Sequence, residues 1–159
     1  MIEESEFEEL YQATAQGLRT YLYRVCGERR IVEDLVQEAY YRFLRSGFSG
    51  ESREHSTRYL YRIATNLLKD HWSDRKRSPE LPDEEPPERP SHDPPQERID
   101  VHSALGGLGR RDREMLWLAY AEGYSHDEIA GILGLKAKSV RVLLFRAKNR
   151  LLRVLKESS

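Results

Sequence analysis

The stretch YSHDEIAGILGLKAKSVRVLLFRAKNRLLRVLK, residues 124–156, begins with an acidic turn and continues as a long basic segment. Eight Lys or Arg lie between Lys136 and Lys156, and no Asp or Glu accompanies them. The whole chain of 159 residues has a formal net charge of only −1. The positive charge is therefore gathered at one end of the chain.

The same stretch carries the signals of two consecutive helices. Ser125 and Glu128 have the S-x-x-E spacing of a capping box, which opens a short helix. Gly134 ends that helix, because glycine readily adopts the left-handed conformation found at helix ends. A longer basic helix begins at about Ala137. A short helix, a glycine-bearing turn and a longer basic helix are the layout of a helix-turn-helix.

The second of these helices has one apolar face and one basic face. With about 100° per residue, the positions that stay close to Val140 form the buried face: Leu144, Ala147, Leu151 and Val154. Other positions point outward or to the flank: Lys138, Arg141, Val142, Phe145, Arg146 and Asn149. A basic helix face can simply be solvated. It also fits the DNA major groove, where phosphates supply affinity and base edges supply sequence information, and the capping box and turn favour DNA binding.

A proline-rich segment separates this region from the first half of the chain. All seven prolines lie between Pro79 and Pro95. The formal net charge is 0 over residues 1–79, −6 over 80–97 and +5 over 98–159. Proline removes backbone donors, and the segment has almost nothing apolar to bury, so we predict an extended, mobile linker. It is either a passive spacer or an occupant of a basic channel on a partner.

Apolar residues recur at three- and four-residue steps on both sides of this linker, which predicts an all-α fold of two small helical domains. The first half should form three helices, over about Ser5–Cys26, Ile31–Leu44 and Thr57–Arg75. The C-terminal half should form four helices, one of them Arg111–Glu122. The polar side chains of the second helix share one face: Asp34, Gln37, Glu38 and Tyr41.

Several functional classes find no support in the sequence. No apolar run of about 18 residues predicts a membrane span, and the acidic N-terminus does not read as an export signal, so we expect a cytoplasmic protein. Cys26 is the only cysteine, and the five histidines lack ligand spacing. We expect no metal, no cofactor and no enzymatic activity.

Three stretches resemble a known family. RDREMLWLAYAEGYSHDEIAGILGLKAKSVRVLLFRAKNRL looks like the C-terminal domain of extracytoplasmic-function (ECF) sigma factors, small sigma subunits of bacterial RNA polymerase. EDLVQEAYYRFL and RYLYRIATNLLKDH resemble the core-binding and promoter-melting helices of that family. The resemblance implies sigma domain 2 over residues 1–77, a linker over 78–98 and sigma domain 4 over 99–159.

The resemblance also implies roles for residues of the first domain. Asp34, Gln37 and Glu38 match the D-x-x-Q-E motif that docks on the largest polymerase subunit, and Tyr41 lies on the same face. The loop 46–56 would hold a flipped base, and we expect Tyr59 to be a core residue rather than a stacking platform. Four residues lie on the helix that engages the minus-ten element: Arg58, Arg62, Asn66 and Lys69.

In the second domain, the resemblance implies residues that face the minus-thirty-five element: Lys138, Ser139, Arg141, Val142, Phe145 and Arg146. The chain departs from the family pattern at Lys136, at Lys138, and at Val142 and Leu143, which stand where the family has a Ser-Arg pair. Val142 could instead touch a thymine methyl group. The exposed apolar positions Val142, Phe145 and Leu152 could serve a protein partner, and an anti-sigma factor is the expected one.

These observations predict a transcription initiation factor that binds core RNA polymerase, directs it to promoter DNA and helps melt it, with no homo-oligomer required. A stand-alone helix-turn-helix regulator and a helical protein-binding adaptor are the alternatives. The first alternative would bind an operator without polymerase, and the second would bind proteins alone.

Overall fold

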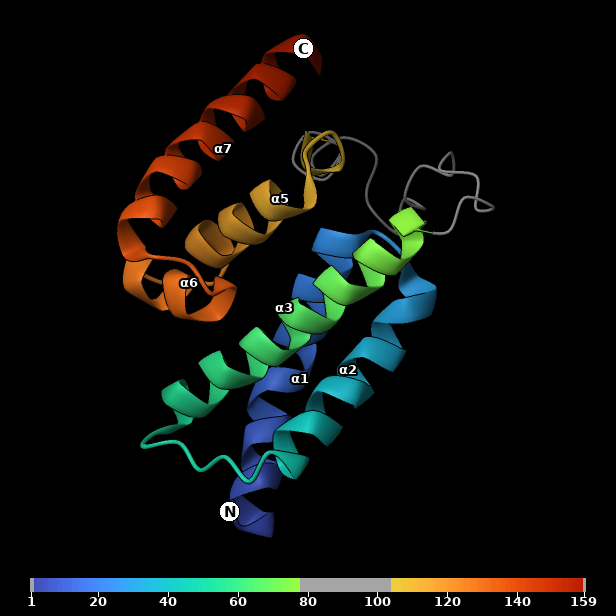
Figure 1. Ribbon diagram of the computed structural model, residues 1–159, viewed down its shortest axis with the longest axis vertical. Coiled ribbons are helices and arrows are strands. Elements are labelled where there is room, and N and C mark those ends of the chain that lie inside the picture. The colour runs from blue at the N-terminus through green and yellow to red at the C-terminus, as the bar shows by residue number, and fades with distance from the viewer. Residues whose placement is uncertain (1, 78–103, 159) are drawn as a thin grey trace.

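The computed structural model describes residues 2–77 and 104–158 of the chain (Figure 1). Within these two ranges every regular element is a helix, which confirms the predicted all-α class. We call residues 2–77 the N-terminal unit and residues 104–158 the C-terminal unit. The predicted linker, residues 78–98, lies outside the described residues.

The N-terminal unit is a bundle of three helices, α1 (Glu4–Cys26), α2 (Arg29–Arg45) and α3 (Arg53–Arg77), as the periodicity predicts. The start of α3 was predicted four residues too late. The Ser52 hydroxyl accepts a hydrogen bond from the backbone N–H of His55 at 3.1 Å, and the Ser52 carbonyl accepts one from Ser56 at 3.0 Å. Ser52 therefore opens the helix before its apolar stripe begins.

The core of the bundle is formed by the predicted apolar stripes of the three helices. Phe43 is fully buried and contacts the rings of Phe7, Phe48 and Tyr59. Leu35 and Ile63 are only partly buried at its margin. The other buried apolar residues of these stripes are Leu10, Leu18, Tyr21, Leu22, Val25, Val36, Ala39, Leu60, Ala64, Leu67 and Leu68.

Two hydroxyl pairs satisfy the polar atoms inside this core. The Thr14 hydroxyl donates to the Leu10 carbonyl at 2.7 Å, so the Tyr40 hydroxyl, 2.6 Å away, must donate to Thr14. The hydroxyls of Tyr21 and Thr65 pair at 2.8 Å and join α1 to α3. The interior of the N-terminal unit thus contains neutral, paired polar groups and no buried charge among its described side chains.

The C-terminal unit contains α5 (Arg110–Leu116), the π-helical turn η1 (Trp117–Ala121), α6 (His126–Leu133) and α7 (Ala137–Ser158). The predicted helix Arg111–Glu122 is therefore divided into two segments, the α-helical α5 and the π-helical turn η1. Residues 104–106 are helical, and residues 78–103 before them lie outside the described residues.

The two units pack against each other, with α6 against α3 and α5 against α1 (Figure 1). A small cluster belongs to the C-terminal unit alone: Leu105, Leu108, Met115, Leu116, Leu144 and Ala147. Five further residues of this unit join the core cluster of the bundle: Leu118, Ile129, Ala130, Ile132 and Val140. The C-terminal unit therefore completes its core against its neighbour. None of the helices described is both long and apolar enough to cross a membrane.

Candidate nucleic-acid interface

The predicted helix-turn-helix is present in α6 and α7. The backbone N–H of Glu128 donates to the Ser125 hydroxyl at 3.2 Å, and the Glu128 carboxylate accepts from the Ser125 N–H at 3.0 Å, so the predicted capping box is confirmed. Gly134 has a φ of 70°, the left-handed conformation that ends α6. The small side chain of Ala130 is buried inside this packing.

The outward face of α7 carries the basic residues that the sequence places there. Val140, Leu144 and Ala147 are buried against the unit, and Val154 and Leu151 are partly buried. Among the predicted minus-thirty-five residues Ser139 is partly buried, and the others are exposed: Lys138, Arg141, Val142, Phe145 and Arg146. Phe145 is 66% exposed and Val142 47% exposed, so the basic face has apolar side chains within it.

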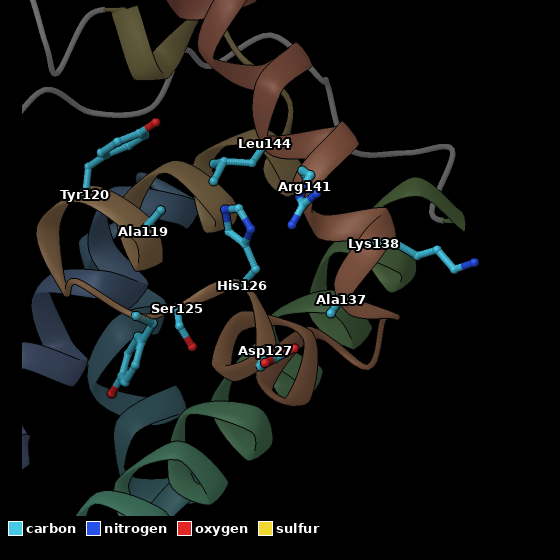
Figure 2. A pocket seen from close by; sticks show the side chains of 10 residues that line it. Ala119, Tyr120, Ser125, His126, Asp127, Ala137, Lys138, Arg141 and Leu144 are labelled. Carbon is cyan, nitrogen blue, oxygen red and sulfur yellow. The ribbon is translucent and has the colours of Figure 1, made fainter.

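A hollow of about 690 Å³ lies beside this face, between η1, α6 and α7 (Figure 2). His126 and Arg141 point toward the same space, whereas Lys138 points away from it. Tyr120, 63% exposed, stands on the η1 side of the hollow. Sequence reasoning missed His126 and Tyr120 as surface neighbours of Arg141, because their proximity depends on how the helices cross.

The turn η1 positions Glu122, which forms a hydrogen bond with the N-terminal unit. The backbone N–H of Glu122 donates to the Trp117 carbonyl at 3.0 Å, five residues back, which defines a π-helical turn. Glu122 then accepts a hydrogen bond from the Tyr61 hydroxyl of α3 at 2.9 Å. Burial, followed by the Glu122 carboxylate, raises the pKa of Tyr61, so this hydroxyl stays protonated and donates.

The predicted minus-ten residues lie along α3, and only part of that row is open to solvent. Arg62, Asn66 and Lys69 are exposed. Arg58 is different, because its Nη1 lies 3.1 Å from Oε2 of Glu128 on α6. This pair could not be predicted from the sequence, because both residues occupy positions that a solvated helix face would also explain.

Arg58 and Arg62 line a groove of about 390 Å³ between α3 and α6. Asp127 and Glu128 line its opposite side. The backbone N–H of Ser125, which donates to the carboxylate, lowers the pKa of Glu128 and keeps it ionised. The groove therefore places carboxylates of the helix-turn-helix opposite the arginines of α3.

Two charged residues are buried where α5 meets α1. The Arg113 guanidinium donates to the carbonyls of Leu108 at 2.9 Å, Gly106 at 3.0 Å and Val25 at 2.8 Å, and the last bond joins the two units. Burial lowers the pKa of Arg113. Glu114, the next residue along the chain, is fully buried.

Glu114 is held by its own helix. Its Oε2 accepts from Arg110 at 2.8 Å, and its Oε1 lies 3.7 Å from Arg111 Nε. Burial raises the pKa of Glu114 in spite of these two arginines. Neither Arg113 nor Glu114 was identified from the sequence, where RRDRE looks like an ordinary charged helix start.

The predicted polymerase-binding residues share an open face of α2. Asp34, Gln37 and Tyr41 are exposed, and Glu38 is partly exposed and pairs with Arg42 at 2.9 Å. Tyr41 is 55% exposed. In Figure 1, α2 lies on the side of the bundle away from the C-terminal unit, and its main contacts are with α1 and α3.

The loop between α2 and α3 is organised by aromatic contacts. Phe48 stacks on Tyr59, with ring centroids 4.1 Å apart, and meets His55 edge-on. Tyr59 is partly buried between Phe48 and Phe43, so it packs against the core, as expected. A pocket of about 280 Å³ lies between this loop and the start of α1. Among the described residues no group of three or more His, Cys, Asp or Glu is placed to hold a metal ion.

Comparisons with known proteins agree with this geometry. The family model for sigma-70 region 2 matches residues 6–78, and that for sigma-70 region 4 matches residues 98–151. The RNA polymerase sigma-E factor of Streptomyces coelicolor is 30% identical over 92% of this chain and 84% of its own length. The chain therefore belongs to the extracytoplasmic-function (ECF) RNA polymerase sigma factors, a group of the sigma-70 family.

Two further proteins are similar to this chain over most of its length. The ECF RNA polymerase sigma factor SigE of Mycolicibacterium smegmatis is 31% identical over 91% of this chain, which spans 60% of that relative's length. The sigma factor RpoE of Bartonella quintana, solved in complex with the anti-sigma factor NepR, has a TM-score of 0.80 at 24% identity, over 95% of this chain and 97% of that one. The likeness to the Bartonella quintana protein, at 24% identity, shows a shared fold.

Proposed function

We propose that this chain binds core RNA polymerase, directs it to specific promoters and helps melt the DNA, as a transcription initiation factor of the ECF type. The observation that carries the proposal is the presence of three separate polar or basic faces on α2, α3 and α7, within two regions that match sigma-70 models. A stand-alone regulator would have no use for the polar face of α2. We propose that the protein works in the cytoplasm and has no enzymatic activity of its own.

The polymerase contact is assigned to the exposed face of α2. Asp34, Gln37 and Glu38 offer acceptors and donors on one side of a rigid helix, and Tyr41 adds an exposed ring one turn later. Polar faces around an exposed aromatic side chain are typical of protein interfaces. We propose that this face docks on the largest polymerase subunit.

The minus-ten contact is assigned to α3. Arg58, Arg62 and Lys69 supply positive charge for phosphates, and Asn66 supplies an amide for a base edge. The pocket beside the loop 46–56 could accept an unstacked base, since melting exposes bases that must be held apart. The boundaries proposed for the DNA-melting domain are residues 1–77.

The minus-thirty-five contact is assigned to the outward face of α7, in a proposed domain of residues 99–159. Arg141 and Arg146 are exposed and positively charged, and Val142 and Phe145 present apolar surface for thymine methyl groups. Lys138 and Ser139, one turn earlier, complete the proposed contact. The exposed apolar trio Val142, Phe145 and Leu152 also supports binding of an anti-sigma factor, which would compete with DNA for this face.

The polymerase assignment is tested by replacing Gln37 and Glu38 together with alanine. We expect at least a tenfold weaker affinity for core polymerase, with an unchanged helical circular dichroism spectrum. The matched control replaces Glu8 and Gln12, exposed residues of α1, with alanine. Equal affinity of the two double variants would remove the assignment of this face.

The minus-thirty-five assignment is tested with Arg141 and Arg146 both replaced by alanine. Transcription by reconstituted polymerase from a library of random promoters should lose its preference for particular upstream sequences, because base and phosphate contacts are lost together. Lys148→Ala with Arg153→Ala, also exposed on α7, removes the same charge and serves as the control. The assignment fails if the upstream preference of the first variant equals that of the control.

A further inference from the structure

The hollow between η1, α6 and α7 brings together two nitrogen-bearing side chains. His126 is the first residue of α6 and Arg141 lies near the start of α7, and both point into this space (Figure 2). Both are exposed, and within residues 2–77 and 104–158 neither forms an ion pair or a hydrogen bond. A guanidinium and an imidazole that share one space without a carboxylate partner leave their donors for an external anion.

The charges around the imidazole also favour an anion. The titratable groups that line the hollow are Tyr120, Tyr124, His126, Asp127, Lys138 and Arg141. Burial, followed by the Glu122 carboxylate, raises the pKa of Tyr124 to about 12, so this hydroxyl stays neutral. Asp127 is the one carboxylate in the lining, and in Figure 2 it lies apart from the Arg141 guanidinium. The space between His126 and Arg141 is therefore positively charged when the imidazole is protonated.

The position of the hollow indicates which anion it meets. Arg141 lines the hollow and is also one of the exposed residues assigned to the minus-thirty-five element. A helix of about 10–12 Å diameter fills a major groove of about 12 Å width, so the sugar-phosphate strands pass along its flanks. A duplex seated on Arg141, Val142 and Phe145 therefore brings one strand beside the hollow.

We infer that the hollow binds a backbone phosphate of the upstream duplex, held jointly by His126 and Arg141, and that His126 couples this binding to the uptake of a proton. The inference rests on the proposed minus-thirty-five role of α7. Histidine changes its charge between about pH 5 and about pH 8, and a phosphate beside the ring favours the charged form. Promoter binding should therefore strengthen as the pH falls through this range.

The site depends on side chains rather than on the end of α6. The N–H groups of Ser125 and Glu128 are already satisfied by the capping box. Tyr120, 63% exposed, stands on the η1 side of the hollow and offers a hydroxyl donor to the sugar-phosphate strand. At about 690 Å³ the hollow has the size of a site for a whole small molecule, which favours a stretch of backbone over a lone phosphate ion.

The test compares the parent chain with His126→Gln, each bound to core polymerase, on promoter fragments that the parent selects from the random library. Glutamine keeps a donor at this position but cannot take up a charge. Fluorescence anisotropy gives the affinities, and the ratio of parent to variant cancels the effect of pH on polymerase itself. We expect a ratio of about three or more at about pH 6 and of about one at about pH 8.

Two further variants control for charge and for other histidines. His126→Arg carries a permanent charge, so it should bind more tightly than the parent at the higher pH. His71→Gln removes a partly buried histidine of the N-terminal unit and should match the parent at both pH values. Because a phosphate contact carries no base information, the loss in His126→Gln should be the same for all upstream sequences.

A second measurement locates the phosphate. Uncharged methylphosphonate linkages are placed one at a time along the upstream element. At the lower pH one linkage should weaken binding of the parent but not of His126→Gln, which has already lost the contact. Either a ratio of affinities that is equal at the two pH values or the absence of such a linkage would overturn the inference.

A titration of the free chain with inorganic phosphate, followed by the histidine NMR signals, distinguishes the two sources of phosphate. We expect no saturating shift of the His126 signal. A saturating shift without any methylphosphonate effect would assign the hollow to free phosphate and overturn the inference.

The failure of this inference differs from the failure of the proposed function. If the parent selects no promoter from the library, or if the variant with Arg141 and Arg146 replaced keeps its upstream preference, the proposed role of α7 is wrong. If that variant loses its preference while His126→Gln matches the parent at both pH values, the phosphate site alone is wrong.

Discussion

The two units stabilise themselves in different ways. The N-terminal unit buries three apolar stripes against one another, and its interior polar groups are neutral hydroxyls that pair, such as Tyr21 with Thr65. The C-terminal unit has a small core of its own and buries two charged residues, Arg113 and Glu114, near its boundary with the bundle. Because several buried residues of the C-terminal unit belong to the core cluster of the bundle, we expect that unit to depend on its neighbour.

This difference bears on a protein for which we propose two promoter contacts, one in each unit. A buried charge costs stability unless it is fully satisfied, so such contacts are less secure than apolar packing. Arg113 obtains one of its three carbonyl partners from α1. The boundary between the units therefore combines apolar packing with a buried charged hydrogen bond, while the buried polar groups inside the bundle are neutral.

The largest effect is expected in the interior of the N-terminal unit. Phe43→Ala should lower the free energy of unfolding by about 3–5 kcal/mol, because Phe43 is fully buried among aromatic neighbours. Urea denaturation followed by circular dichroism measures the loss, and Leu44→Ala, at an exposed site, is the control.

The same Phe43 variant also tests whether the C-terminal unit depends on the bundle. If it does, amide hydrogen exchange in α6 should accelerate together with exchange in α3, because their side chains share a cluster. Unchanged protection of α6 would show that the C-terminal unit does not depend on the bundle for its stability.

An intermediate effect is expected at the boundary. Arg113→Met should cost about 2 kcal/mol, because it leaves the carbonyls of Leu108, Gly106 and Val25 without their donor. Exchange should accelerate in α5 and at the end of α1 and stay slow in the middle of the bundle. Arg153→Met, at an exposed site of α7, should change neither the free energy of unfolding nor the exchange rates. Equal losses of stability in the two variants would contradict the role given to Arg113.

The smallest effect is expected at the start of α6. Ser125→Ala should cost about 1 kcal/mol, because it removes the hydroxyl that accepts from the Glu128 N–H. Faster exchange should be confined to the first turn of α6. If the loss spreads through the bundle, the two units are coupled more tightly than their separate cores indicate.

Periodicity predicted most of the fold, because the apolar stripe of a helix is a local property of the sequence. The stripes through Leu18, Phe43 and Leu60 are buried as expected, and the capping box of Ser125 follows from a four-residue signal. The exposed face of α7 follows from the same rule. These features need no knowledge of distant parts of the chain.

The unpredicted contacts between the two units depend on residues that are far apart in the sequence. Arg58 and Glu128 are 70 residues apart in sequence, and each has an ordinary local explanation. The Arg113 bond to Val25 spans 88 residues. Glu114 is fully buried on α5, which packs on both α1 and α7, helices that lie far from it in the sequence.

Glu128 uses its two carboxylate oxygens for two different tasks. Oε1 accepts from the Ser125 backbone at the start of α6, and Oε2 faces Arg58 of the other unit. One side chain thus closes the first turn of the helix-turn-helix and also ties that turn to the N-terminal unit. A single substitution at this position would disturb local and long-range order together.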